Sequence, residues 1–141
     1  MIVVFDTSAL IKRYIAETDS NHVNTAWSTA KMLCASWITE AEMLATFARK
    51  RREAIVNPAD LGAAEYCFLA DWPTFVRVEP YRISSLLPML HRTHPLRGAD
   101  SIHLATALTL RNLLQHDGII FGTADDRLIK AAKTEGLEVM P

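Results

Sequence analysis

The sequence predicts an α/β fold, a three-layer sandwich in which helices cover both faces of a mostly parallel sheet of four to five strands. Short apolar runs alternate along the chain with longer segments of helical periodicity, and this alternation is typical of parallel sheets with helical crossovers. The first run, residues 2–5, is apolar at every position, as expected of a strand that is buried on both faces. The length of 141 residues predicts one domain that spans 1–141.

The first half of the chain is expected to form two strands and four helices. The first strand ends at Asp6, and helical signals follow it. A second short apolar run ends at Ser36, and a long helical stretch begins at Thr39. Asn57 followed by proline is typical of a helix cap and first turn. The expected ranges are 2–5 and 33–36 for strands, and 9–16, 21–32, 39–54 and 58–72 for helices.

The second half continues the same alternation. Alternating residues at 74–79 predict a third strand, and a helix at 82–93 must break or bend at Pro88. A strongly apolar helix follows Gly98, and Gly136 is expected to end the last helix. The remaining ranges are 99–115 and 124–135 for helices, and 118–121 and 137–140 for strands.

Composition narrows the class of protein. Half of the residues are hydrophobic and 22% are charged, which excludes a disordered tail or a fibrous protein. The net charge of −1 argues against a nucleic-acid binder that relies on bulk positive charge, but leaves a local basic patch open. Cys34 and Cys67 lie far apart in no metal-type spacing, so neither a disulfide framework nor a zinc site is expected. With no signal peptide and no membrane-length apolar run, we expect a cytoplasmic protein.

Four carboxylates fall where chemistry is expected in such a fold, outside the carboxyl ends of the strands. Asp6 follows the first strand, and Glu42 lies in the first turn of the helix after the second. Asp100 begins the apolar helix before the fourth strand, and Asp125 follows that strand. We therefore expect Asp6, Glu42, Asp100 and Asp125 to meet at one edge of the sheet.

Each of these acids also has a purely local explanation. Asp6 can cap the next helix or build a turn. The spacing of Thr39 and Glu42 fits a capping box. Asp100 complements the dipole of its helix, and Asp125 belongs to a capped helix start.

Taken together, the acids indicate a cation site. Four carboxylates at one edge repel each other unless a cation lies among them. Oxygen ligands without cysteine favour a hard ion, Mg²⁺ or Mn²⁺. Such an ion supports the attack of water on a phosphodiester. The number of ions, one or two, stays open.

Four segments of the sequence resemble the PIN-domain nucleases, and within them the small VapC-type toxins of toxin–antitoxin pairs. They occur in the family's order and spacing over nearly the whole chain, and read VVFDTSALIK, SWITEAEML, GADSIHLATAL and FGTADDRLIKAAKTEGLEV. The resemblance implies a PIN-like fold and a ribonuclease that depends on Mg²⁺ or Mn²⁺. It also implies an RNA substrate, a cognate VapB-type antitoxin whose tail reaches the acidic site, and a homodimer.

The resemblance assigns the catalytic and metal-binding roles to the same four acids. Asp6 and Asp100 carry over as metal ligands, and Glu42 and Asp125 complete the site directly or through waters. Asp125 is preferred for the fourth position because it stands two residues after Thr123. Asp126, which sits beside it and fits the capping position better, is its rival. Ser8 and Thr123 are candidates to orient the carboxylates by hydrogen bonds, whereas Glu40 should point elsewhere.

Several other residues admit a structural or a functional reading. His103 stands three residues after Asp100 and is either a partner of that acid or a satisfied core residue. The basic run 49–52 is either a solvated helix end or a contact for RNA phosphates. Lys12, Arg13 and Arg97 are better placed to hold RNA. The tryptophans are expected in the core or a dimer interface, at positions 27, 37 and 72.

Three alternatives were compared with the sequence. Another metal-dependent phosphoryl-transfer hydrolase, such as a haloacid-dehalogenase-like phosphatase, needs an acid two residues after Asp6, where this chain has Ser8. A receiver domain carries its acidic pair after the first strand, whereas the pair here comes late in the chain. A PIN-like module that only binds a protein partner would be marked by loss of one or more acids, and all four are present.

Overall fold

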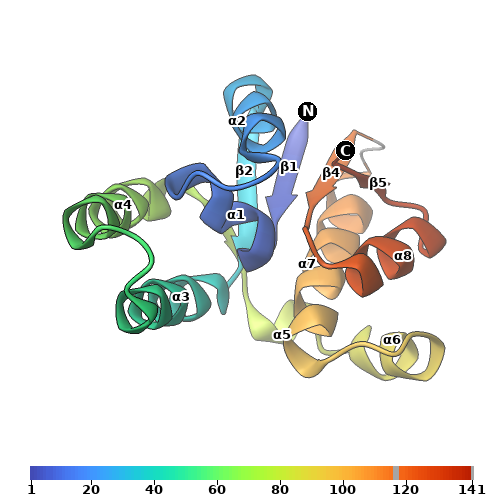
Figure 1. The fold of residues 1–141 in the computed structure, drawn as a ribbon. Coiled ribbons are helices and arrows are strands. Elements are labelled where there is room, and N and C mark those ends of the chain that lie inside the picture. Colours follow the sequence, from blue (N-terminus) through green and yellow to red (C-terminus); the bar gives the residue numbers. More distant parts are fainter. Residues whose placement is uncertain (116–117, 141) are drawn as a thin grey trace.

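A five-stranded, entirely parallel sheet forms the middle layer of the computed structural model, which describes residues 1–115 and 118–140. The order of the strands across the sheet is β3-β2-β1-β4-β5. This confirms the predicted three-layer α/β fold and its fifth strand (Figure 1). The strands are β1 (Ile2–Phe5), β2 (Met32–Ser36), β3 (Val76–Val78), β4 (Ile119–Gly122) and β5 (Glu138–Val139).

Helices bury both faces of the sheet because alternate strand residues point to opposite sides. Val3 and Phe5 of β1 pack with one group of helices, and Ile2 and Val4 pack with the other. The first group is α1 (Thr7–Tyr14), α2 (Ser20–Thr29), α3 (Thr39–Glu53) and α4 (Pro58–Asp71). The second group is α5 (Pro80–Ile83), α6 (Leu87–Thr93), α7 (Gly98–Leu114) and α8 (Asp126–Thr134).

The strand order creates a switch point beside β1. From β1 the chain builds the sheet outward through β2 to β3, and it then returns to the other side of β1 with β4 and β5. The ends of the two central strands meet closely, since the Asp6 N–H donates to the Gly122 carbonyl oxygen at 2.9 Å. Open α/β sheets bind ligands outside the carboxyl ends of the strands at such a switch point.

Some boundaries differ from those predicted. The helix expected at 21–32 ends at Thr29, and Met32 already pairs with Ile2 as the first residue of β2. A 3₁₀ turn, η1 (Trp72–Thr74), precedes β3 and shortens the strand expected at 74–79.

The segment expected as one helix at 82–93 forms two, α5 and α6. Pro88 lies in the first turn of α6, where its missing N–H leaves no helical hydrogen bond unmade. The break therefore comes just before the proline. In the part of the chain that is described, no helix combines the length and the apolar character needed to cross a membrane.

Gly122 packs too closely against β1 to accept a side chain. A Cβ atom there would lie 2.7 Å from Cδ1 and 2.9 Å from Cε1 of Phe5, which is fully buried. We expect Gly122→Ala to lower the free energy of unfolding by about 1–3 kcal/mol, as measured by urea denaturation. The control is Gly62→Ala in α4, where a Cβ meets nothing within 4 Å and should stabilise the helix by about 0.5–1 kcal/mol. Equal stability of both variants would contradict the packing seen at Gly122.

Candidate active site

All four predicted acids line one cavity. It has a volume of about 310 Å³ and lies where β1 and β4 end. Further side chains of its lining come from α1, α3 and α7. The lining comprises Asp6, Thr7, Ser8, Ile11, Glu42, Thr46, Arg49, Arg97, Asp100, His103 and Asp125.

Each acid stands at the N-terminal end of a helix. Asp6 is the N-cap of α1, and Asp125 is the N-cap of α8. Glu42 and Asp100 lie in the first turns of α3 and α7. Because the N-terminal end of a helix carries partial positive charge, four helix dipoles stabilise the negative charge that the carboxylates bring together. The fold thus assembles an acidic site that four separate segments supply.

Asp6 is the most enclosed of the four, with 4% of its surface exposed. Its Oδ1 accepts hydrogen bonds from the Ser8 hydroxyl at 2.8 Å and from the Ala9 N–H at 3.0 Å. The Thr123 hydroxyl donates to its Oδ2 at 2.8 Å. Burial raises the pKa of Asp6 above 3.8, and the positive charge of His103 and these hydrogen bonds oppose the rise. Ser8 and Thr123 therefore contact the carboxylate that they were expected to orient.

Glu42 is held by two neighbours at the same oxygen. Its Oε2 lies 2.6 Å from the Thr7 hydroxyl and 2.6 Å from Nε2 of His103. Burial acts to raise the pKa of Glu42, but the hydrogen bond and charge of His103 and the hydrogen bond from Thr7 outweigh it and lower the pKa.

The sequence predicted the role of His103 only in part. It is buried, as a core histidine would be, yet it contacts Glu42 and not Asp100, the acid on its own helix. Among the described residues its Nδ1 has no hydrogen-bond partner. Thr7, the other partner of Glu42, was not singled out, although it directly follows Asp6 in the sequence.

Three of the acids are anchored through one oxygen and keep the other available. Glu42 uses Oε2, Asp100 accepts from the Arg97 N–H through Oδ2 at 3.3 Å, and Asp125 accepts from the N–H groups of α8 through Oδ1. Within residues 1–115 and 118–140, no hydrogen bond is formed by the second oxygen of these three side chains. Each is thus oriented by one oxygen and has a second one free for a ligand.

The donor set suits a hard divalent cation that keeps part of its water. In the described part of the chain, no three His, Cys, Asp or Glu side chains are arranged to hold an ion as they stand. Mg²⁺, however, is usually bound directly by only one or two carboxylates and retains several waters. Carboxylate oxygens around an open cavity meet that requirement, and a cation among them would relieve the cost of keeping Asp6 ionised and buried.

The structure corrects two local interpretations. Thr39 and Glu42 do not form a capping box, because the N-cap of α3 is Ile38 without a side-chain bond and Glu42 turns to Thr7 and His103. Asp125, not Asp126, is the capping residue of α8. The expectation that Asp126 fits the cap better is therefore wrong. Asp126 and Glu40 are exposed and do not line the acidic cavity.

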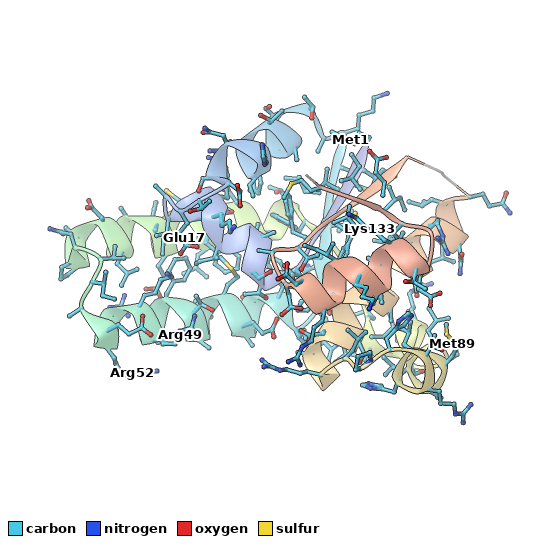
Figure 2. The ribbon with its side chains drawn as sticks, turned by 45° about the vertical axis from the view of Figure 1, so that its right-hand side comes forward. Met1, Glu17, Arg49, Arg52, Met89 and Lys133 are labelled. Carbon is cyan, nitrogen blue, oxygen red and sulfur yellow. The ribbon has the colours of Figure 1, made fainter. Side chains whose placement is uncertain are left out.

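The basic residues that line the acidic cavity are only partly those that the sequence predicted. Arg49, labelled on α3 in Figure 2, and Arg97 line the acidic cavity. Lys12 instead faces Asp19 at 3.6 Å, and the guanidinium of Arg13 stacks 5.1 Å from the ring centre of Trp27. Of the basic run, Lys50 and Arg51 form ion pairs with Glu17 and Glu65. Arg97 is thus the only one of Lys12, Arg13 and Arg97 that lies in the acidic cavity.

Two of the three tryptophans lie in or against the core, one of the two locations predicted for them. Trp72 is buried, and Trp27 packs against the same core cluster through ring contacts with Phe5 and Phe75. Trp37 is 44% exposed, so it is not a core residue.

Comparisons with known proteins identify related chains. A family model described as "PIN domain" matches residues 3–134. Two Mycobacterium tuberculosis proteins, Ribonuclease VapC45 of strain CDC 1551 and Ribonuclease VapC49 of strain H37Rv, are each 30% identical over 99% of this chain and 95% of theirs.

Solved structures share the fold at lower identity. FitAcB from Neisseria gonorrhoeae aligns with a TM-score of 0.65 at 13% identity and covers 99% of this chain and 96% of that one. VapBC-1 from nontypeable Haemophilus influenzae aligns with a TM-score of 0.60 at 17% identity and covers 99% and 97%. The family model and the two relatives confirm the resemblance found in the four sequence segments, and the solved structures support the fold.

Proposed function

Since the chain belongs to the PIN-domain family, we propose that it is a metal-dependent ribonuclease that cuts RNA internally, and the toxin of a toxin–antitoxin pair. Relatives at 30% identity over nearly the full chain are named as ribonucleases. The observation that carries the proposal is the single cavity onto which Asp6, Glu42, Asp100 and Asp125 all open.

The proposed chemistry is direct attack of water on phosphorus. When bound, Mg²⁺ or Mn²⁺ lowers the pKa of water and stabilises the negative charge that develops on the phosphate. Asp6 and Asp100 are the proposed direct ligands, with Glu42 and Asp125 acting directly or through waters. Thr7 and His103 hold Glu42 in place, and Ser8 and Thr123 do the same for Asp6. Arg49 and Arg97 at the rim are positioned to neutralise the incoming RNA phosphates.

The proposed protein partner is a VapB-type antitoxin that masks the acidic cavity. Structural neighbours include toxin–antitoxin complexes, among them VapBC2 from Rickettsia felis bound to promoter DNA. A homodimer and a cytoplasmic location belong to the same proposal.

The alternative hydrolase and the binding module gain no support from the site. Ser8, at the position where a phosphatase of the haloacid-dehalogenase type needs its second acid, donates its hydroxyl to Asp6. A module that only binds a partner has no use for four carboxylates held at one cavity, each oriented by its own hydrogen bonds.

The proposal is tested by incubating the purified chain with total bacterial RNA in Mn²⁺, Mg²⁺ or EDTA. We expect discrete fragments in the metal lanes only, with 5′-phosphate and 3′-hydroxyl ends. Co-purified antitoxin is removed by a denaturing wash and refolding, because it would block the cavity. Cleavage that persists in EDTA, or no cleavage by refolded protein that binds Mn²⁺, would refute the proposed function.

Metal binding should also stabilise the fold. At a Mn²⁺ concentration 100 times its Kd, we expect about 2.7 kcal/mol of stabilisation, which raises Tm by roughly 5–10 °C. Asp100→Asn should reduce this rise by at least half. The matched control is Asp60→Asn, because Asp60 occupies the same third position of its helix, α4, but lies outside the acidic cavity. An equal rise in wild type and Asp100→Asn, measured by scanning calorimetry, would remove Asp100 from the metal site.

A further inference from the structure

A second cavity, distinct from the acidic one, lies between α6 and α8. Its volume is about 400 Å³, and the two helices lie next to each other in both views (Figures 1 and 2). One wall comes from the end of α6 and the residues after it, and the other from one face of α8. The lining comprises Thr93, His94, Pro95, Arg127, Lys130, Ala131 and Thr134.

This cavity carries positive charge without any acid in its lining. Arg127 and Lys130 are both exposed on the α8 wall. Of the two acids next to it in sequence, Glu135 is bound at 2.6 Å by Nε2 of His94, and neither Glu135 nor Asp126 lines the cavity. A concave surface of this kind attracts anions, because low-dielectric walls focus the field of the two cations.

In the described part of the chain, Arg127 and Lys130 have no partner, unlike four of the other basic residues. Lys12, Arg49, Lys50 and Arg51 each face an acid within ion-pair distance. Among the residues that the structure describes, the side chains of Arg127 and Lys130 form no ion pair, hydrogen bond or ring contact. Two cations that share a cavity without a counter-charge repel each other, and an anionic ligand would relieve this repulsion.

α8 connects the basic cavity directly to the acidic one. The N-cap of α8 is Asp125, and the Arg127 N–H donates to its Oδ1 at 2.9 Å. Lys130 comes five residues after Asp125, a rise of about 7.5 Å along a helix. A strand whose scissile phosphate lies in the acidic cavity therefore reaches Arg127 and Lys130 with a phosphate close to the cut.

We propose that the α6–α8 cavity is a second RNA site, in which Arg127 and Lys130 each bind a backbone phosphate a few nucleotides from the cut. The inference rests on the proposed ribonuclease function and adds the path of the substrate. RNA is favoured over an acidic protein segment because the cations lie on the same helix as Asp125, a proposed acid of the cleavage site, within reach of a strand bound there. The contact is to phosphate, so it positions the strand and reads no sequence.

The test is binding of a fluorescein-labelled, mixed-sequence single-stranded RNA in EDTA, followed by fluorescence anisotropy at four NaCl concentrations. Losing two phosphate contacts should weaken binding by Arg127→Ala/Lys130→Ala about tenfold near 0.1 M salt, and make the slope of log K against log salt shallower by about 1.4. The matched control is Arg92→Ala/Lys133→Ala. It removes the same total charge, one from α6 and one from α8, at exposed positions outside the cavity. It should change affinity less than twofold.

Two results would overturn the inference. Equal weakening by both double variants would mean that only net charge matters. Unchanged binding and slope in Arg127→Ala/Lys130→Ala, or no RNA binding by the wild type, would leave an acidic protein segment as the occupant. Cleavage in Mn²⁺ is measured in parallel on the wild type. A wild type that does not cleave but shows the predicted difference in slopes would contradict the ribonuclease proposal and leave the RNA site standing.

Discussion

Asp6→Asn is expected to lower RNA cleavage at least about 10³-fold, a loss of about 4 kcal/mol of transition-state stabilisation. The variant removes the charge of the most deeply buried acid of the cavity. It keeps the side-chain shape and the capping of α1, since asparagine caps helices as well as aspartate does. Single-turnover cleavage in saturating Mn²⁺ measures the effect. A rate within tenfold of the wild type would show that Asp6 has no part in catalysis.

The same variant should not destabilise the metal-free protein. Burial raises the pKa of Asp6 above 3.8, so the folded state binds this proton more tightly than the unfolded chain does. The wild type therefore loses stability as pH rises from 3.8 through the higher folded pKa, whereas Asp6→Asn does not. We expect the Tm of Asp6→Asn minus that of the wild type, both in EDTA, to increase over this range and then level off. A difference that falls with rising pH would contradict the burial argument.

His103→Ala is expected to lower both Mn²⁺ affinity and cleavage by 10- to 100-fold, the usual cost of losing a residue that orients a metal ligand. His103 lies 2.6 Å from Oε2 of Glu42 and lowers the pKa of that carboxyl together with Thr7, against the effect of burial. His103→Gln, which keeps a donor of similar reach, should recover part of the loss.

The control for His103 is Tyr14→Phe. The Tyr14 hydroxyl donates to Oδ2 of Asp71 at 3.1 Å, and neither residue lines the acidic cavity. This variant also loses a hydrogen bond to a carboxylate but should cleave at the wild-type rate. All rates are measured well below the Tm of each variant. Full activity and full Mn²⁺ affinity in His103→Ala would mean that the histidine serves only the core.

The parts of the fold that follow from local pattern were predictable from the sequence. The β1 run is apolar throughout because it is buried on both faces. The alternation of strands and helices along the chain predicted a parallel sheet. The four acids were therefore expected at one edge of the sheet, and all four line one cavity. Boundaries were less accurate where two signals compete, as at Met32, whose apolar side chain suits either the end of a helix or the start of a strand.

Contacts between segments distant in the sequence could not be predicted from local pattern. His103 and Glu42 are 61 residues apart, so the histidine could be compared only with Asp100, its neighbour on the same helix. The capping-box spacing of Thr39 and Glu42 was real but misleading, because tertiary partners compete for the carboxylate. The assignment of the cap of α8 to Asp126 failed by one residue, since spacing alone does not say where a helix begins.

The most direct test of the account is a Mn²⁺ titration by electron paramagnetic resonance, with cleavage of a labelled RNA measured on the same samples. The set comprises the wild type, Asp6→Asn, Glu42→Gln, Asp100→Asn, Asp125→Asn and Asp126→Asn. We predict that the first four substitutions weaken Mn²⁺ binding and cleavage together, and that Asp126→Asn, outside the acidic cavity, leaves both within twofold of the wild type. Wild-type Mn²⁺ affinity in all four, or cleavage that does not follow metal binding, would contradict a shared metal site at these acids.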